Sequence, residues 1–143
     1  MSATTTNLTN PRTAGLVAEW TPRLLSVLRI VVALLFIEHG TQKLFGFPAP
    51  PSFGFPAAFS LLWFAAALEV GGGLLLLLGL FTRPVAFLLS GEMAVAYWMA
   101  HAPRGAFPVL NGGEGAILFC FIFLYLAAAG GGAWALDRAL SRR

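Results

Sequence analysis

The sequence predicts an all-α integral membrane protein, a four-transmembrane-helix bundle with both the N- and the C-terminus in the cytoplasm. Hydrophobic residues make up 58% of the 143 residues and charged residues only 10%, against about 25% charged residues in an average soluble domain. The mean hydropathy is +0.80. Four apolar segments each approach the ~20 residues that a membrane-spanning helix needs, and the asymmetry of Lys and Arg around them fixes the orientation.

The four predicted spans cover residues of about 23–45, 57–80, 84–102 and 112–130, within one transmembrane domain of residues 21–132. The first connection, "GFPAPPSFGFP", is rich in Pro and Gly and cannot continue a helix. The second, "GLFTRP", is a tight turn with Pro84 in the first turn of the next helix, where proline is tolerated. The third is "HAPRGAFPVLNGG", and the glycines 130–132 end the last span.

Polar or amphipathic segments flank the apolar domain at both ends. Residues 1–20 are predicted to be a flexible N-terminal segment, because they begin with a long polar stretch. This stretch does not resemble a cleaved signal peptide. Residues 133–143 are predicted to form an amphipathic cytoplasmic tail. In this tail Trp134, Leu136 and Leu140 lie on the membrane surface while the arginines reach anionic headgroups.

Basic residues lie mainly on one side of the predicted bundle. The outer flanks hold only Lys43 and Arg104, so the opposite side is placed in the cytoplasm. Arg29 lies inside the first span and is expected to extend to the same cytoplasmic side. The net charge of +3 is too small and dispersed for a nucleic-acid-binding protein. The inner flanks hold Arg12, Arg23, Arg83, Arg138, Arg142 and Arg143.

Each predicted helix carries one glutamate. A charge at the bilayer centre costs about 3 kcal/mol on insertion scales, so these carboxylates are expected to face one another, a cation or water inside the bundle. The polar groups concentrate in the outer half, which predicts a polar pocket that opens outward. The candidate catalytic residues are Glu38, His39, Lys43, Glu69 and Glu92, and the candidate ligand-binding residues are Tyr97, Trp98, His101, Asn111 and Glu114.

Each of these residues also has a structural interpretation. Glu114 follows Asn111 by three residues, as in a variant capping box. Lys43 at a helix end can extend to the headgroups, and His101 can simply end its helix at the interface. The aromatic residues Tyr97 and Trp98 fit an interfacial belt, and glycines after Glu69 allow close helix packing. For the whole set, the structural alternative is an ion-paired core that matches Glu38 and Glu92 with Lys43, His39 or Arg29.

A quinone is the cofactor that fits these residues best, because its amphipathic head group enters from lipid and needs few donors in an apolar pocket. Di-iron bundles use Glu-x-x-His on two helices, and no glutamate here has a histidine three residues later. A bis-histidine haem would need His39 and His101 at matched depths, whereas they are offset by about 5 Å. The single Cys120 cannot form an internal disulfide or a CxxC pair. Haem and metal stay open as weaker alternatives.

The chain resembles the DoxX family of membrane proteins over nearly its whole apolar length. The resemblance lies in "FIEHGTQKLFG", "LEVGGGLLLLLGLFTRPVA", "GEMAVAYWMAHAP", "NGGEGAILFCFIFLYLA" and "GGGAWALDRAL", taken in order. It implies a redox-associated membrane bundle, because some family members are linked to thiosulfate:quinone oxidoreductase and others to oxidoreductase complexes. The positions that carry over from the family pattern are Arg29, His39, Lys43, Glu69, Arg83 and Glu114.

Two classes of function follow. The first is a quinone-linked oxidoreductase, or the membrane subunit of a redox complex, in the cell (inner) membrane with a soluble or membrane redox partner. The second is a non-catalytic scaffold or lipophilic-ligand-binding bundle, in which the carboxylates are ion-paired. A small transporter, assembled as a homo-oligomer, is a weaker alternative, because four helices are few for alternating access.

Overall fold

The computed structural model describes residues 11–141, which form helices and connecting loops and contain no strand in that range. This confirms the all-α prediction. Two helices, Thr13–Phe45 and Leu61–Leu78, are long and apolar enough to cross a membrane, and Glu114–Ala129 is a shorter apolar helix. The elements in chain order are α1 (Pro11–Phe45), α2 (Leu61–Leu78), α3 (Thr82–Ala96), the π-helix η1 (Tyr97–His101), the 3-10 helix η2 (Ala102–Arg104), α4 (Pro108–Asn111), α5 (Glu114–Ala129) and α6 (Leu136–Leu140).

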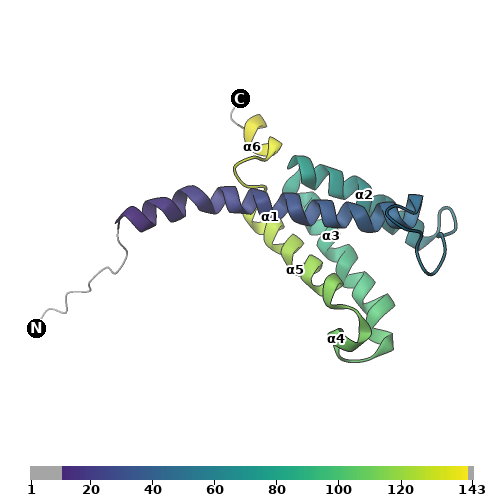
Figure 1. Ribbon diagram of the computed structural model, residues 1–143. Helices are drawn as coiled ribbons and strands as arrows, with labels where there is room; N and C mark the ends of the chain where they lie inside the picture. The colour runs from purple at the N-terminus through teal and green to yellow at the C-terminus, as the bar shows by residue number, and fades with distance from the viewer. Residues whose placement is uncertain (1–10, 142–143) are drawn as a thin grey trace, which may run out of the picture.

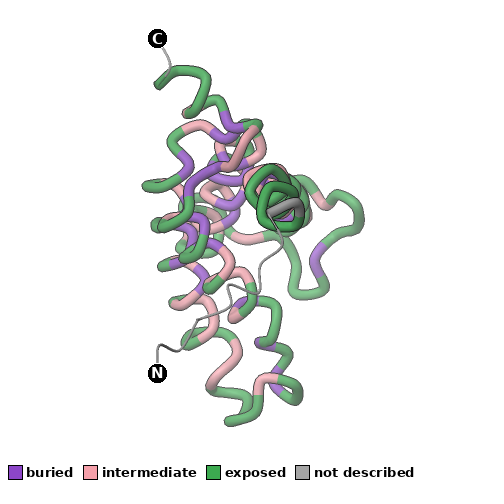
Figure 2. Tube along the Cα trace, turned by 90° about the vertical axis from the view of Figure 1, so that its left-hand side faces the viewer, coloured by how far each residue is buried: buried purple, intermediate pink, exposed green. Residues whose placement is uncertain are grey.

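The helices are arranged as two pairs that cross. α1 packs along α2, and α3 packs along α5 (Figure 1). Figure 2 views α1 end-on while the other pair runs from top to bottom, and buried segments lie where the pairs meet. The core at this crossing contains Phe36, Leu76, Leu89, Phe123 and Leu126. The predicted spans correspond to α1, α2, α3 with η1, and α5, and the number that cross the bilayer stays a prediction.

α1 starts well before the predicted first span. Of the N-terminal segment predicted to be flexible, residues 11–20 are helical, and residues 1–10 lie outside the described part of the chain. Pro11 occupies the first helical position, which suits its fixed φ. Pro22 does not end the helix, and Glu19 and Arg23 form an i,i+4 ion pair of 2.7 Å across it.

The other helix ends lie within a few residues of the predicted bounds. α2 begins after Ser60, whose hydroxyl accepts a hydrogen bond from the Trp63 N–H at 3.2 Å, and ends at Gly79 in the left-handed conformation. Ser and Gly are the residue types that favour these two cap positions. The third predicted span is divided, because α3 changes to the π-helix η1 at Tyr97.

Arg29 is buried, with 1% of its surface exposed, so the expectation that it extends to the membrane surface is wrong. Its Nε donates to the Gly131 carbonyl at 2.8 Å, and its Nη1 donates to the carbonyls of Leu76 and Leu77, the latter at 2.6 Å. The last carbonyls of a helix lack intrahelical partners. Arg29 is therefore buried because its guanidinium donates hydrogen bonds to carbonyl groups at the end of α2 and in the loop before α6.

The chain after α5 is fixed to the other helices by hydrogen bonds. The Asp137 carboxylate accepts from the backbone N–H groups of Phe81 and Thr82 at 2.7 and 2.8 Å, and so caps α3. The Trp134 N–H donates to the Ser26 hydroxyl at 3.0 Å. The predicted tail thus includes a docked helix, α6, while Arg142 and Arg143 lie outside the described residues.

Gly40 and Gly73 set the distance between α1 and α2, whereas the sequence pointed only to the glycines after Glu69. A Cβ added to Gly40 would lie 2.8 Å from the Ala66 carbonyl oxygen, and one added to Gly73 would lie 2.6 Å from Ile37. Real side chains do not approach this closely, so the two helices can pack at this distance only with glycine at these positions.

Gly40→Ala is expected to lower the thermal unfolding midpoint in detergent, because overpacking against the α2 backbone costs about 1–3 kcal/mol. Gly71→Ala is the matched control, since an added Cβ there meets nothing within 4 Å in the described structure. The control should gain about 0.5–1 kcal/mol through helix propensity. Equal effects of the two substitutions would contradict the close packing of α1 on α2.

Asp137→Ala is expected to destabilise the protein by about 1 kcal/mol, the usual value of a lost helix cap. Burial raises the pKa of this carboxyl, but the hydrogen bonds from Thr82 and Phe81 and the charge of Arg29 outweigh it and hold the pKa below its ordinary 3.8. The cap therefore contributes fully above that pH and is lost as the pH falls through the lowered folded-state pKa. Acid unfolding curves of Asp137→Ala and the wild type should converge at low pH, and a constant offset would contradict the role of the ionised carboxylate.

Candidate functional site

A cavity of about 200 Å³ lies where α1, α2, α3, η1 and the start of α5 come together. It is at the end of the helices opposite to Arg29 and Asp137. Four of the polar residues singled out in the sequence line it together with apolar and small residues. The lining consists of Phe36, His39, Lys43, Glu69, Met93, Ala96, His101, Gly112, Gly115, Ala116 and Phe119.

An ion pair between Lys43 of α1 and Glu69 of α2 forms one wall of the cavity. The Lys43 side chain is 19% exposed and that of Glu69 is 3% exposed. Lys43 therefore points inward and does not extend to the headgroups. Gly40 makes this contact possible, because it lets α1 approach the backbone of α2 next to Glu69. The pair neutralises two charges in surroundings where a lone charge is costly.

Glu92 of α3 adds a second buried carboxylate beside this pair. Both of its carboxylate oxygens, and Oε2 of Glu69, are buried without a hydrogen-bond partner within residues 11–141. Glu92 is close enough to Glu69 and Lys43 for their charges to act on it. Buried polar atoms are almost always hydrogen-bonded in proteins. The unpaired oxygens of Glu69 and Glu92 are therefore candidate positions for a proton, water or a ligand.

Two imidazoles face the cavity from different elements. The His39 ring is exposed beside α1 and meets the ring of Phe119 edge-on, with centroids 5.7 Å apart. His101 Nδ1 lies 3.2 Å from the Asn111 carbonyl oxygen, and its ring stacks on Tyr97 with centroids 6.4 Å apart. Since a carbonyl only accepts, Nδ1 carries the proton in this bond and Nε2 is left for another partner.

The apolar walls of the cavity come from Phe36, Met93 and Phe119. Phe36 and Phe119 have ring centroids 5.4 Å apart, and this contact joins α1 to α5. The periodicity of α1 could have identified Phe36, because positions 36, 39 and 43 share one helix face. Met93 and Phe119 carry no such signal, since their place depends on how α3 and α5 pack against α1.

The remaining predicted site residues, Glu92 among them, do not line the cavity. Glu38 is exposed and points about 100° away from its neighbour His39 on the helix, so it does not share the helix face that lines the cavity. Glu114 is exposed in the first turn of α5. Trp98 is 71% exposed and packs against Tyr97, and Tyr97 reaches the site only through His101.

Asn111 has a structural role, and the capping-box interpretation is wrong in detail. Its amide nitrogen donates to the Gly105 carbonyl and its amide oxygen accepts from the Gly113 N–H, both at 2.8 Å. Gly113 is the N-cap of α5, and no side chain of the described residues caps that helix end. Asn111 therefore fixes the loop that carries His101 and Gly112 next to the cavity.

The partners in the ion-paired core differ from the predicted ones. Lys43 pairs with Glu69, whereas the structural alternative matched basic groups with Glu38 and Glu92. Arg29 is bonded to carbonyl groups at the other end of the molecule. Within residues 11–141 there is no group of three or more His, Cys, Asp or Glu side chains arranged to hold a metal ion.

Comparisons with known proteins show which family and which proteins this chain resembles. A family model described as DoxX matches residues 24–102. The chain is 48% identical to an uncharacterized protein of Haemophilus influenzae over 83% of this chain and 92% of that one. It is 33% identical to the inner membrane protein YphA of Escherichia coli, over 82% of this chain and 90% of that one. It is 30% identical to the inner membrane protein YqjF of the same organism, over 82% and 92%. No solved structure matches the chain significantly.

Lys43→Met is expected to destabilise the protein by about 3 kcal/mol or more, because it leaves the Glu69 carboxylate buried and unpaired. The double variant Lys43→Met/Glu69→Gln should recover part of that loss in a double-mutant cycle of unfolding free energies. Glu92→Gln is the matched control, because its carboxylate oxygens have no hydrogen-bond partner to lose in the described structure. Additive single-variant effects, with no coupling between Lys43 and Glu69, would contradict the buried pair.

Proposed function

Because the chain belongs to the DoxX family and is a multi-pass protein of the inner membrane, we propose that it binds a quinone head group in the cavity beside the Lys43–Glu69 pair. In this proposal the protein is a quinone-linked membrane oxidoreductase or, more narrowly, the quinone-binding membrane subunit of a redox complex. The observation that carries the proposal is the combination of an unpaired buried oxygen of Glu69 and two imidazoles with apolar walls in one small cavity.

The size and lining of the cavity support a ring-sized ligand. Its volume of about 200 Å³ is below the ~300–1,000 Å³ of pockets that enclose a drug-sized molecule. One six-membered ring fits such a space, while a lipid tail must remain outside. The rings of Phe36 and Phe119 offer flat apolar surfaces, and Met93 adapts to irregular shapes.

A route from the lipid supports the same ligand class. His39 both lines the cavity and is exposed on the surface. It lies where α1 meets α5 through aromatic rings. Apolar side chains around it on α1 are exposed, among them Leu34 and Leu35. An amphipathic ring can therefore enter sideways from the membrane while its isoprenoid tail stays among lipid chains.

The residues of the cavity supply hydrogen bonds and protons. Reduction of a quinone to a quinol takes up two electrons and two protons, and the electrons come from a reduced redox partner. The imidazole of His39 donates to a quinone oxygen, and Nε2 of His101 accepts from the hydroxyl of the quinol that forms. The carboxyl groups of Glu69, in the cavity wall, and of Glu92 behind it hand on protons. The Lys43 ammonium stabilises the negative charge that develops on the quinone ring during reduction.

We also propose the orientation that the basic residues favour. Arg23, Arg83 and Arg138 lie at the end of the helices where both the N-terminal part of α1 and the tail are found, and Lys43 and Arg104 lie toward the other end. Under the positive-inside rule this puts both termini in the cytoplasm. With α1, α2, α3 with η1, and α5 as four spans, the cavity opens in the outer half of the membrane.

The test is binding of a short-tailed ubiquinone analogue to the protein in lipid nanodiscs, followed by the shift in thermal unfolding midpoint. His39→Ala should weaken binding of the analogue about tenfold, the effect of one lost hydrogen bond, and His101→Ala should weaken binding of its quinol form by a similar factor. Leu34→Ala is the matched control on the lipid-facing side of α1 and should bind like the wild type.

Two results would contradict the quinone proposal. One is the absence of any midpoint shift with the analogue at concentrations that saturate known quinone proteins. The other is a shift that is equal in the wild type and in both histidine variants. Either result would leave the scaffold function, in which the Lys43–Glu69 pair serves stability.

A further inference from the structure

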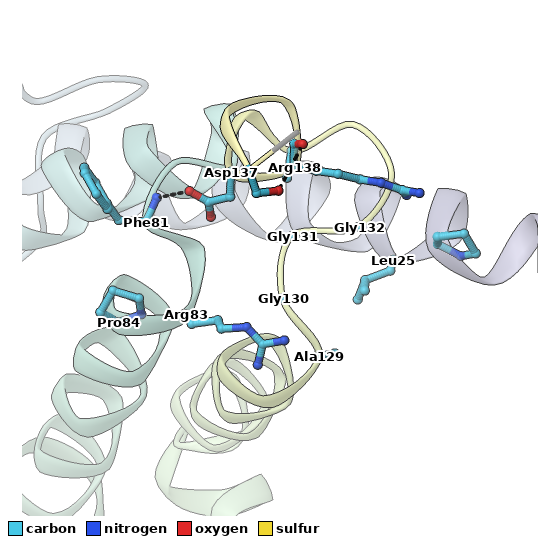
Figure 3. A pocket seen from close by; sticks show the side chains of 13 residues that line it. Leu25, Phe81, Arg83, Pro84, Ala129, Gly130, Gly131, Gly132, Asp137 and Arg138 are labelled. Carbon is cyan, nitrogen blue, oxygen red and sulfur yellow. Dashed lines mark hydrogen bonds between the residues drawn. The ribbon is translucent and has the colours of Figure 1, made fainter. Parts of the chain in front are cut away.

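A second, larger hollow lies at the opposite end of the molecule from the candidate quinone site. Its volume is about 610 Å³, and it is bounded by the start of α3, the end of α5, the glycine loop 130–132 and α6 (Figure 3). This volume falls within the ~300–1,000 Å³ range of sites that enclose small molecules. The quinone proposal does not use any residue of this hollow.

Two arginines reach the hollow from different elements. Arg83 Nη1 donates to the carbonyls of Ala127 and Ala128 at 3.2 and 2.5 Å, which fixes the guanidinium at the end of α5. Its Nε and Nη2 have no acceptor among the described residues. Figure 3 shows this group below Gly130, while Arg138 extends above Gly131 and Gly132. A fixed guanidinium with free donors is the usual partner of a phosphate group.

The one acidic residue in the lining, Asp137, offsets only part of the positive charge of the two arginines. Both carboxylate oxygens of Asp137 already accept hydrogen bonds from the backbone of Phe81 and Thr82. The Asp137 carboxylate is therefore directed to the α3 cap and away from a ligand. Arg138 is exposed, and its guanidinium makes no hydrogen bond or ion pair within residues 11–141.

Apolar side chains complete the hollow on the membrane side. Leu25 of α1 and Pro84 of α3 line it, and so does Phe81, which is 61% exposed. The adjoining surface of α3 continues with the exposed Phe87 and Leu88. A ligand here would contact arginines at one end and an apolar helix surface at the other. A phospholipid has the matching parts, an anionic headgroup and apolar acyl chains.

We propose that this hollow binds an anionic phospholipid, with its phosphate against Arg83 and Arg138 and its acyl chains along α3. Basic hollows between membrane helices bind lipid headgroups in this way. Because the lipid would contact α1, α3, α5 and α6 together, it would also hold the tail against the helices. A free inorganic phosphate has the same head-group chemistry but makes no use of the apolar wall.

The test is native mass spectrometry of the full-length protein released from mild detergent. Phosphatidylglycerol, phosphatidylcholine and inorganic phosphate are each titrated separately. Arg138→Gln and Arg83→Gln should each lower the apparent affinity for phosphatidylglycerol about fivefold, the value of one basic residue near anionic lipid. Arg104→Gln carries the same charge change at the other end of the molecule and should bind like the wild type.

Arg83→Gln also removes hydrogen bonds to the end of α5, so Arg138→Gln is the decisive variant, since its side chain makes no hydrogen bond in the described structure. Preferential phosphatidylglycerol binding that Arg138→Gln weakens and Arg104→Gln does not would support the site. Equal binding of phosphatidylcholine, equal binding by all variants, or binding of inorganic phosphate as strong as that of the lipid would each overturn it.

Discussion

The pairing of charges in apolar surroundings is the constraint on which the rest of the structure depends. Lys43 and Glu69 are joined across α1 and α2, because neither charge is stable alone among hydrocarbon side chains. Gly40 lets the two helices approach closely enough for the contact. Once α1 and α2 are fixed in this register, His39 and Phe36 face α5, and Glu92 of α3 is brought beside the pair. The Lys43–Glu69 contact therefore accounts both for the packing of α1 on α2 and for the position of the residues around the cavity.

The polar groups at the two ends of the molecule differ in their hydrogen bonding. At one end, Arg29 and Asp137 use their side chains to satisfy the ends of α2 and α3 and the loop before α6. At the other end, Glu92 and one oxygen of Glu69 are buried without partners within residues 11–141. At the first end most buried polar side chains are hydrogen-bonded, and the Thr82 hydroxyl is the exception. At the second end, unsatisfied carboxylate oxygens lie near two imidazoles and a cavity, and this is the basis of the proposed binding site.

Much of this arrangement could be predicted from residue types alone. Composition gave the all-α membrane class, and the cost of buried charge brought Lys43, Glu69 and Glu92 into one group. Glu38 was included because it lies in the same apolar run as His39. One residue along a helix turns a side chain by about 100°, so Glu38 points to the surface and away from the cavity. The role of Arg29 depends on a loop about a hundred positions later, and the crossing of the helix pairs depends on side-chain fit. Neither leaves a periodic signal in the sequence.

The most direct test of the account is an experimental density map of the protein in lipid nanodiscs, at a resolution that shows side chains. The account predicts the Lys43 ammonium against the Glu69 carboxylate, with His39 and His101 around one hollow that contains ordered water or ligand density. A Lys43 side chain extended to the headgroups, with the carboxylates of Glu69 and Glu92 facing separate surroundings, would contradict it.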